Sequence, residues 1–209
     1  MNNGSLPVDP FNVIITGVGG QGNVMASRML GNALARKGYY VTIGETFGVS
    51  QRGGSVMSHM RISKISSWSP QIPRGKANMV VALEPSEALR VLGVYGNEKV
   101  CVISNTRPIH PVGVIAGEAN YPPFEELTRA IRELSGETIF IPATEEALEA
   151  GNPILVNVIM MGAVSERGIL PFGPDDFREV ASATMPAERL DMNLGAFRRG
   201  MHLVKKGGA

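Results

Sequence analysis

The stretch Phe11-Asn12-Val13-Ile14-Ile15-Thr16-Gly17-Val18-Gly19-Gly20-Gln21-Gly22 joins a run rich in β-branched residues directly to a glycine-rich turn. The residues that follow, to about Lys37, carry apolar side chains at helical spacing, and Gly38 is placed to end that helix. A second short strand is predicted at 39–43. Together these patterns predict a strand, a glycine turn, a helix and a strand, which is the βαβ unit of a parallel sheet.

The rest of the chain continues this alternation. Further strands are predicted at 55–62, 78–83, 99–104 and 137–141, and further helices at 85–92, 124–134, 144–150, 153–165, 174–182 and 186–204. The proline-bearing connection at 105–123 could carry one β-hairpin arm. We predict a disordered tail at 1–10 and a single α/β domain at 11–209, with three layers, a Rossmann-like arrangement and a mostly parallel sheet.

Charge and composition exclude several classes of function. The 209 residues include 20 Lys and Arg against 19 Asp and Glu, so the net charge is +1. Neither nucleic acid nor an anionic membrane is therefore an expected partner, because both require a basic surface. No apolar run reaches the ~18 residues of a membrane helix, and the first residues do not resemble a signal peptide. We expect a cytoplasmic protein.

The cysteine count limits the cofactors that the chain can hold. Cys101 is the only cysteine. An internal disulfide is therefore excluded, as is an iron–sulfur cluster or zinc site built by this chain alone, since such sites need several thiolates or a Cys/His set. Cys101 lies in an apolar strand, where a buried small side chain is a better interpretation than a nucleophile.

The first candidate site is the glycine turn itself. Gly17, Gly19 and Gly22 match the spacing of the dinucleotide fingerprint, and Glu45 follows close to where that fingerprint expects an acidic residue. The amide N–H groups that begin the next helix suit an anion such as a phosphate. Binding of NAD or FAD is one interpretation, and a tight turn used only for packing is the other. Gln21 adds a polar amide that a plain dinucleotide site does not need.

The second candidate site is the segment Gly48-Val49-Ser50-Gln51-Arg52-Gly53-Gly54. Arg52 is a permanent cation whose planar donors suit a phosphate or a carboxylate, and the two glycines after it could expose backbone N–H groups. A solvated loop arginine is an equally good interpretation. Because neighbouring strands of a parallel sheet end at one crevice, we expect this segment to meet the glycine turn there.

Other polar residues have ordinary interpretations beside the functional ones. His59 and Arg61 alternate on one strand and could line the same crevice, although a half-exposed pair is the preferred interpretation. Glu84 and Glu87 lie at a predicted helix start, where we expect them to cap the helix. We find no catalytic triad order, phosphate-binding lysine motif, metal-binding histidine motif or paired carboxylate. A glycine-rich crevice without a nucleophile, metal or cluster of its own is typical of one part of a larger enzyme.

Several motifs in one order resemble the gamma-type subunit or domain of the 2-oxoacid:ferredoxin oxidoreductases. The form and length of the chain are most similar to the beta subunit of the indolepyruvate enzyme. Two positions depart from that pattern: Asn78 stands where Asp is expected, and Phe47 where His is common. The resemblance is carried by Gly17–Gly22, Gly44-Glu45-Thr46, Ser50-Gln51-Arg52-Gly53-Gly54-Ser55-Val56, Ser69-Pro70-Gln71-Ile72-Pro73, Ala77-Asn78, Glu84-Pro85-Ser86-Glu87-Ala88-Leu89-Arg90, Asn157, Met161-Gly162-Ala163, Asn193 and Ala196-Phe197.

This resemblance implies a pyruvate-ferredoxin oxidoreductase gamma (domain III)-like fold and a role as an accessory subunit. The whole enzyme would convert a 2-oxoacid, with coenzyme A as co-substrate, to an acyl-CoA and CO2, and would reduce ferredoxin. Thiamine diphosphate, magnesium and [4Fe-4S] clusters would lie on an alpha-type partner subunit, and the isolated chain would bind none of them and be inactive. The alternatives are a stand-alone NAD(P)- or FAD-binding protein and the gamma subunit of a pyruvate or 2-oxoglutarate enzyme.

Overall fold

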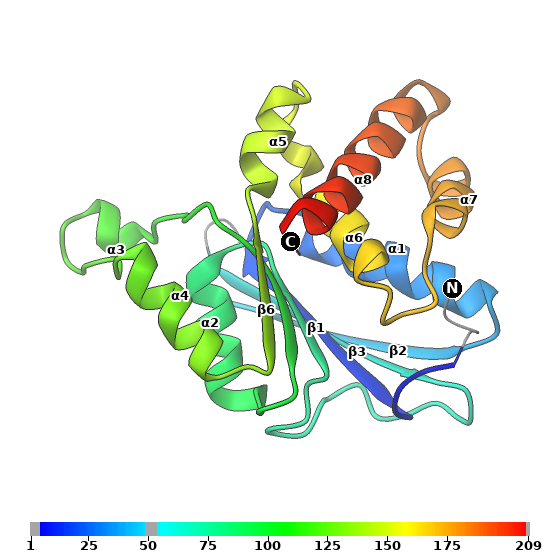
Figure 1. Ribbon diagram of the computed structural model, residues 1–209, viewed down its shortest axis with the longest axis horizontal. Coiled ribbons are helices and arrows are strands. Elements are labelled where there is room, and N and C mark those ends of the chain that lie inside the picture. Colours follow the sequence, from blue (N-terminus) through cyan, green and yellow to red (C-terminus); the bar gives the residue numbers. More distant parts are fainter. Residues whose placement is uncertain (1–4, 49–53, 208–209) are drawn as a thin grey trace.

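A six-stranded sheet in the order β2-β3-β1-β4-β5-β6 forms the centre of the protein (Figure 1). The computed structural model describes residues 5–48 and 54–207. Three of the neighbouring pairs are parallel, and β3 runs antiparallel to both of its neighbours. The predicted mostly parallel sheet is therefore confirmed. The strands are β1 (Phe11–Val18), β2 (Tyr40–Phe47), β3 (Ser55–Ser63), β4 (Met79–Ala82), β5 (Cys101–Asn105) and β6 (Glu137–Ile141).

Helices cover both faces of the sheet, so the predicted three layers are also confirmed. One apolar core lies between the sheet and α1, α6, α7 and α8, and a second lies between the sheet and α2 and α4 (Figure 1). The helices are α1 (Asn23–Arg36), α2 (Pro85–Tyr95), α3 (Val112–Ile115), α4 (Phe124–Glu133), α5 (Ala143–Glu149), the 3-10 turn η1 (Pro153–Leu155), α6 (Val156–Arg167), α7 (Pro174–Thr184) and α8 (Ala187–Gly207).

The first βαβ prediction is wrong in one respect. β2 does not pair with β1, because β3 lies between them and pairs with both. The chain from β2 to β3 spans only 48–54, and so short a connection joins antiparallel neighbours, whereas a parallel pair needs a longer crossover. Near this connection, Val56 of β3 lies opposite Gly17 of β1 on one side and opposite Phe47 of β2 on the other.

The connection at 105–123 contains no β-hairpin arm. Its described residues form the short helix α3 and otherwise have no regular structure. Pro111 immediately precedes α3 with φ −60°, and its carbonyl accepts hydrogen bonds from Val114 and Ile115. Proline sets φ near the helical value and has no N–H to leave unpaired, which favours a helix start over a strand here.

Two glycines let α6 and α8 pack against each other closely. A Cβ atom at Gly162 would overlap the backbone of Phe197, and one at Gly200 would overlap the backbone of Ile159. Both overlaps are with rigid main chain, so neither position has room for a side chain. The close approach carries α8, the last helix, across the layer that covers β5 and β6.

The predicted tail and domain boundary stay predictions. Residues 1–4 lie outside the described part, whereas Leu6 packs against the core and the Asp9 carboxylate accepts a hydrogen bond of 2.8 Å from the backbone N–H of Lys64. Among the described residues, no helix combines the length and the apolar character needed to cross a bilayer.

Candidate functional site

The glycine turn lies at the carboxyl end of β1, and its geometry requires glycine at several positions. Gly20 and Gly22 have φ values of 101° and 84°, in the left-handed region that L residues rarely adopt. A Cβ atom at Gly17 would lie 2.5 Å from Oε1 of Gln21 and 2.7 Å from Oδ1 of Asn23. The turn is therefore packed by polar side chains of its own chain.

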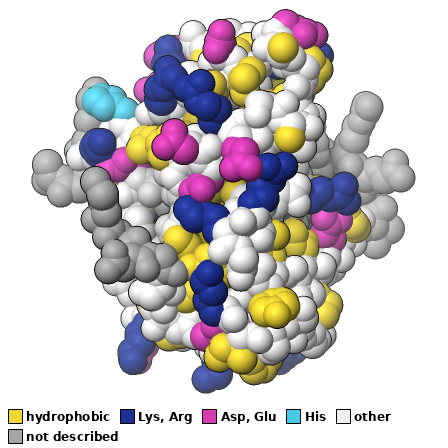
Figure 2. Space-filling model, turned by 90° about the vertical axis from the view of Figure 1, so that its right-hand side faces the viewer, with side chains coloured by type: hydrophobic (Ala, Val, Ile, Leu, Met, Phe, Trp, Pro, Cys, Tyr) yellow, Lys and Arg dark blue, Asp and Glu magenta, His cyan; other side chains and the backbone are white. Residues whose placement is uncertain are grey.

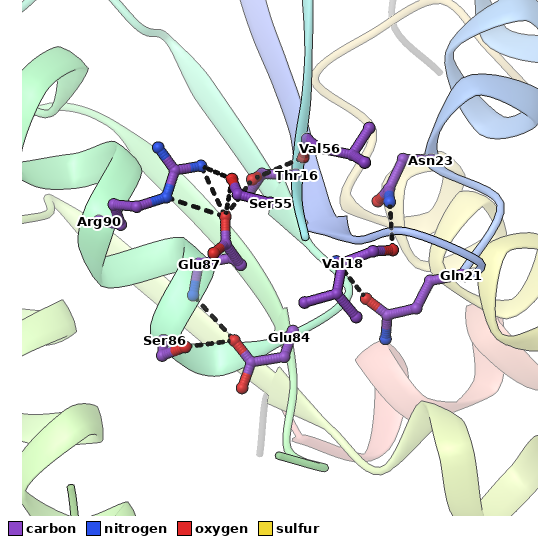
Figure 3. Close-up of polar contacts among 10 residues, drawn as sticks. All are labelled: Thr16, Val18, Gln21, Asn23, Ser55, Val56, Glu84, Ser86, Glu87 and Arg90. Carbon is purple, nitrogen blue, oxygen red and sulfur yellow. Dashed lines mark hydrogen bonds and ion pairs between the residues drawn. The ribbon is translucent and has the colours of Figure 1, made fainter. Parts of the chain in front are cut away.

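Gln21 closes the turn through a hydrogen bond to Val18 (Figure 3) and also joins it to the neighbouring strand β4. Its Oε1 accepts a hydrogen bond of 2.8 Å from the backbone N–H of Val18, and its Nε2 donates one of 2.9 Å to the carbonyl of Leu83, just after β4. The amide that distinguishes this turn from a plain dinucleotide fingerprint thus holds the ends of β1 and β4 together.

Two buried asparagines complete the surroundings of the turn. Nδ2 of Asn23 donates to the carbonyl of Val18 at 3.1 Å, and Nδ2 of Asn157, on α6, donates to the carbonyl of Gly22 at 3.4 Å. The Oδ1 atoms of both asparagines are buried and have no hydrogen-bond donor among the described residues. α1 also begins without a side-chain cap and without an acidic residue in its first turn. The amide N–H groups that start α1 are therefore not neutralised by a carboxylate of that helix.

The two glycine-rich segments meet at this edge. The backbone N–H of Gly19 donates a hydrogen bond of 2.8 Å to the carbonyl of Gly54. Gln51, Arg52 and Gly53 lie outside the described residues, so their predicted roles stay predictions. The meeting of the segments nonetheless places residue 54 directly against the glycine turn.

Glu87 connects the residues that flank both glycine-rich segments (Figure 3). Its Oε2 accepts hydrogen bonds from Oγ of Ser55 at 2.7 Å and from Oγ1 of Thr16 at 3.4 Å. Arg90 pairs with the same oxygen at 2.6 Å and also contacts Ser55. Thr16 precedes Gly17, and Ser55 follows Gly54. One carboxylate therefore fixes the strand residues that flank the two segments, one before the glycine turn and one after the second segment.

Glu84 has the predicted capping role and a further partner. Its Oε2 accepts a hydrogen bond of 2.9 Å from the backbone N–H of Glu87, which caps α2. Its Oε1 accepts a hydrogen bond from the hydroxyl of Tyr121, which ties the 105–123 connection to the start of α2. Burial, together with the neighbouring Glu84 carboxylate, raises the pKa of Tyr121 above its ordinary value. Tyr121 therefore keeps its proton and donates a hydrogen bond to the Glu84 carboxylate.

A small hollow of about 240 Å³ opens beside the turn. Its walls combine Gly20 and Gln21 with apolar side chains of the 105–123 connection and of η1, including Ile109 and the 70% exposed Ile154. Asn105 donates hydrogen bonds to the Leu83 carbonyl and to Oγ1 of Thr144, and these bonds fix the floor between β4 and α5. The hollow is neutral and partly apolar.

Glu45 does not lie where a dinucleotide site needs its acidic residue. It lies in β2, which β3 separates from β1, and its carboxylate pairs with Nε of Arg28 at 3.7 Å. A ribose held at the end of β1 would therefore have no such partner on a neighbouring strand. Since Gln21 also fills the turn, this geometry does not favour the dinucleotide interpretation.

The predictions for His59 and Arg61 are wrong. Both are buried, with exposed fractions of 4% and 9%, because the loop that follows β3 covers this face of the strand. Nδ1 of His59 accepts a hydrogen bond of 3.3 Å from the backbone N–H of Ile72, and burial lowers the pKa of His59 below its usual 6.5. Neither residue lines the crevice at the carboxyl ends of the strands.

The described residues do not offer a set of ligands for a metal or cluster. No group of three or more His, Cys, Asp and Glu lies close enough together among them to hold a metal ion. The only cysteine of the chain, Cys101, is buried, and burial raises its pKa to about 11. Cys101 is therefore a protonated, shielded thiol, as the sequence predicts, and the donor set does not fit an iron–sulfur cluster.

Charges on the surface are mixed. On the side of the molecule shown in Figure 2, basic side chains are interspersed with acidic ones. α1 and α7 are joined by pairing of Arg36 with Glu179 and of Lys37 with Asp176, the latter at 2.9 Å. Such pairs reduce the net field around these two helices.

The sequence reasoning missed the residues that cross between distant elements. Nothing local in the sequence marks Tyr121 or Thr16 as part of the site, or identifies the partner of either. Asn105 and Thr144, 39 positions apart, were missed for the same reason. Asn157 was named as part of a motif, but its contact with Gly22 depends on a helix 135 positions away.

Comparison with known proteins gives one consistent result. Residues 12–203 match the family described as "Pyruvate ferredoxin/flavodoxin oxidoreductase". The chain is 38% identical over 197 residues to the "Indolepyruvate oxidoreductase subunit IorB" of Thermococcus kodakarensis, covering 94% of this chain and 96% of that protein. These matches confirm the resemblance drawn from the motifs.

Solved structures share the fold. The gamma subunit of a keto/oxoacid ferredoxin oxidoreductase from Geobacter sulfurreducens matches with a TM-score of 0.67 at 16% identity, over 94% of this chain and 99% of that one. A 2-oxoglutarate:ferredoxin oxidoreductase from Magnetococcus marinus matches with a TM-score of 0.74 at 21% identity, over 95% of this chain but 32% of that one. In the second structure, the same fold is one part of a longer chain.

Proposed function

Because the chain belongs to the pyruvate ferredoxin/flavodoxin oxidoreductase family, we propose that it is the accessory subunit of a cytoplasmic, thiamine-diphosphate-dependent ferredoxin oxidoreductase that acts on indolepyruvate or a related arylpyruvate. The observation that carries the proposal is the 38% identity to a subunit named for indolepyruvate, over nearly the full length of both chains. Relatives named for 2-oxoglutarate and for pyruvate/ketoisovalerate are 27% and 29% identical. The arylpyruvate substrate is therefore the best supported.

The cofactors of this enzyme belong to a partner subunit. Cys101, buried and protonated, cannot supply the thiolates of a [4Fe-4S] cluster, and no three His, Cys, Asp or Glu residues of the described chain are grouped as metal ligands. We propose an alpha-type partner that carries thiamine diphosphate, magnesium and the clusters. Ferredoxin would receive two electrons from that partner as the 2-oxoacid and coenzyme A become an acyl-CoA and CO2.

The carboxyl edge of the sheet is the surface that this chain would present to the partner's active site. Gln21 and the buried asparagines satisfy the backbone there with neutral groups, so the turn can approach another chain or a ligand closely without the cost of burying a charge. The exposed Ile154 and the neighbouring hollow supply apolar area beside it. This edge would orient substrate and exclude water, and would not break bonds itself.

Arg52 is the residue of this chain that we expect to contact an anionic group. It belongs to the segment that ends at Gly54, and Gly54 is bonded to the turn. A guanidinium at this edge would bind the substrate carboxylate or a phosphate of coenzyme A, and Gln51 and Gly53 would shape the loop around it. The alternative role, a solvated loop arginine, predicts no effect on either substrate.

The proposal is tested by producing the chain together with its partner subunit. A purified complex that contains iron and thiamine and reduces a dye or ferredoxin with indolepyruvate would support it, provided that the isolated chain is inert. Arg52→Ala should raise the KM for coenzyme A or for the 2-oxoacid about tenfold or more, and Arg52→Lys should restore part of the loss. An isolated chain that binds NAD or flavin and turns over alone would overturn the proposal.

A further inference from the structure

A second cavity lies at the opposite edge of the sheet from the glycine turn. It has a volume of about 650 Å³ and opens where the parallel strands begin, between the start of β1, the start of β4 and the residues just before β5. This is the lower edge in Figure 1. Its polar and charged lining is Arg61, Lys76, Lys99, Glu98, Asn12, Asn78 and Asn97.

Arg61 is a buried cation without a carboxylate. Its exposed fraction is 9%, and it forms no ion pair with any described residue. Nε donates to Oδ1 of Asn12 at 3.1 Å, Nη1 donates to the carbonyl of Ser69 at 3.3 Å, and the ring of Trp68 lies 4.8 Å from the guanidinium carbon. Nη2 has no acceptor in the described part of the chain. A buried charge that is only partly satisfied is costly, so this site favours an anion.

The rim of the cavity adds to the same charge. Lys76 and Lys99 line it and are exposed, and neither pairs with an acidic residue of the described chain. Glu98 is the only acidic residue in the lining. Three cations against one carboxylate leave a net charge of +2 around a hollow that is large enough for a small molecule.

Side-chain amides cross-link the segments that line the cavity. Nδ2 of Asn12 donates to the Lys76 carbonyl at 2.8 Å, and the backbone N–H of Asn12 donates to Oδ1 of Asn78 at 2.8 Å. Asn97 donates to the Gly75 and Ala77 carbonyls and accepts from the N–H of Lys99. The floor and both basic rim residues are therefore held by neutral amides.

We propose that this cavity binds the phosphate group of a small phosphorylated ligand. Arg61 would hold the oxyanion at the floor through Nη2, and Lys76 and Lys99 would neutralise its second charge at the rim. A carboxylate carries one charge and would use only part of this set. The site lies at the other end of the strands from the edge proposed to meet the partner, so it is separate from the function proposed above.

Substitution of Asn78 gives the most direct test of anion binding in this cavity. Its Oδ1 already accepts a hydrogen bond from the N–H of Asn12, and an aspartate would accept the same bond. Asn78→Asp would therefore keep this bond while placing a carboxylate in the cavity that Arg61 also lines. Asp is also the residue that the motif pattern leads us to expect at this position. The added negative charge would offset the positive charge of Arg61 and repel a phosphate.

The test is titration calorimetry of the full-length chain with sodium pyrophosphate, with acetate at equal ionic strength as the comparison. We expect saturable binding of pyrophosphate and none of acetate. Asn78→Asp should weaken the binding at least tenfold, and the double variant Lys76→Gln/Lys99→Gln should weaken it several-fold. Arg107→Gln, which removes an exposed cation from the 105–123 connection, is the matched control and should leave binding unchanged.

Unfolding temperatures measured without anion show whether each variant is folded, and pyrophosphate should raise that of the native chain more than that of Asn78→Asp. The proposal is overturned if pyrophosphate does not bind, or if the folded Asn78→Asp chain binds it as tightly as the native chain. It is overturned equally if the lysine double variant and Arg107→Gln have the same effect.

Discussion

The two edges of the sheet are built in opposite ways. At the carboxyl edge, neutral side-chain amides form hydrogen bonds with the backbone. Gln21 joins the ends of β1 and β4, and Asn23 and Asn157 bond to carbonyl groups of the turn. At the amino edge, amides instead hold cations in place, with Arg61 buried and without an ion pair in the described chain. One edge therefore fits a close approach by another chain, and the other fits an anion.

This contrast would let one fold serve the two proposed tasks separately. The carboxyl edge contains glycines at positive φ and a backbone-to-backbone bond between distant segments, which are features that depend on fine geometry. The amino edge depends on charge and tolerates small displacements, because Coulomb attraction falls off gradually with distance. Changes in shape should therefore damage the first edge most, and changes in charge or pH should act mainly on the second.

The largest effect is expected from a side chain in the glycine turn. Gly22→Ala would force alanine into a positive φ and would also drive Cβ into the buried Asn157 amide. We expect a loss of about 3 kcal/mol in the free energy of unfolding. Gly20→Ala is the matched control, since it has a similar φ but open space around Cβ, and should lose about 1 kcal/mol. Equal losses in denaturant unfolding would show that Asn157 does not pack the turn.

An intermediate effect is expected when Gln21 acquires a charge. Gln21→Glu keeps the acceptor for the Val18 N–H but places a carboxylate against the Leu83 carbonyl, to which Nε2 now donates. We expect a loss of about 2 kcal/mol at pH 8. Part of it should return at pH 5, where the introduced carboxyl group can be protonated and can donate again. A loss that is independent of pH in urea unfolding would contradict this account of the turn.

The smallest effect is expected from His59, on the same strand as Arg61. Burial lowers the pKa of the folded His59 below the 6.5 of the exposed group, so the unfolded chain binds a proton more readily. His59 therefore imposes no penalty above about pH 6.5, and stability falls as the pH drops below that value, by at most about 1.4 kcal/mol per pH unit. His59→Gln should flatten this slope, whereas substitution of the exposed His110 should not. Identical slopes would contradict the account.

Local patterns were sufficient for most of the fold. Val13, Ile14 and Ile15 followed by glycines marked β1 and its turn, and the apolar spacing after Gly22 marked α1. These signals depend on residues close together in the chain. The position of β3 between β1 and β2 could not be predicted in the same way, because periodicity shows which residues are buried and does not show which strands pair.

The candidate site was predictable only in part. The glycines and Gln21 form a local cluster that the sequence alone reveals, but the bond from Gln21 to Leu83 joins residues 62 positions apart. Alternation on β3 predicted a half-exposed Arg61, whereas the loop containing Ser69 covers it. Burial by a distant or irregular segment leaves no pattern in the strand itself, so tertiary packing decided both outcomes.

The central claim is that this chain completes an enzyme whose chemistry lies on its partner. The most direct test is to purify the two subunits separately and titrate this chain into the partner while following indolepyruvate-dependent reduction of ferredoxin. We expect activity to rise to a plateau at a fixed ratio of the subunits, and neither subunit to be active alone. A partner that reaches full activity without this chain, or a chain that oxidises substrate by itself, would contradict the claim.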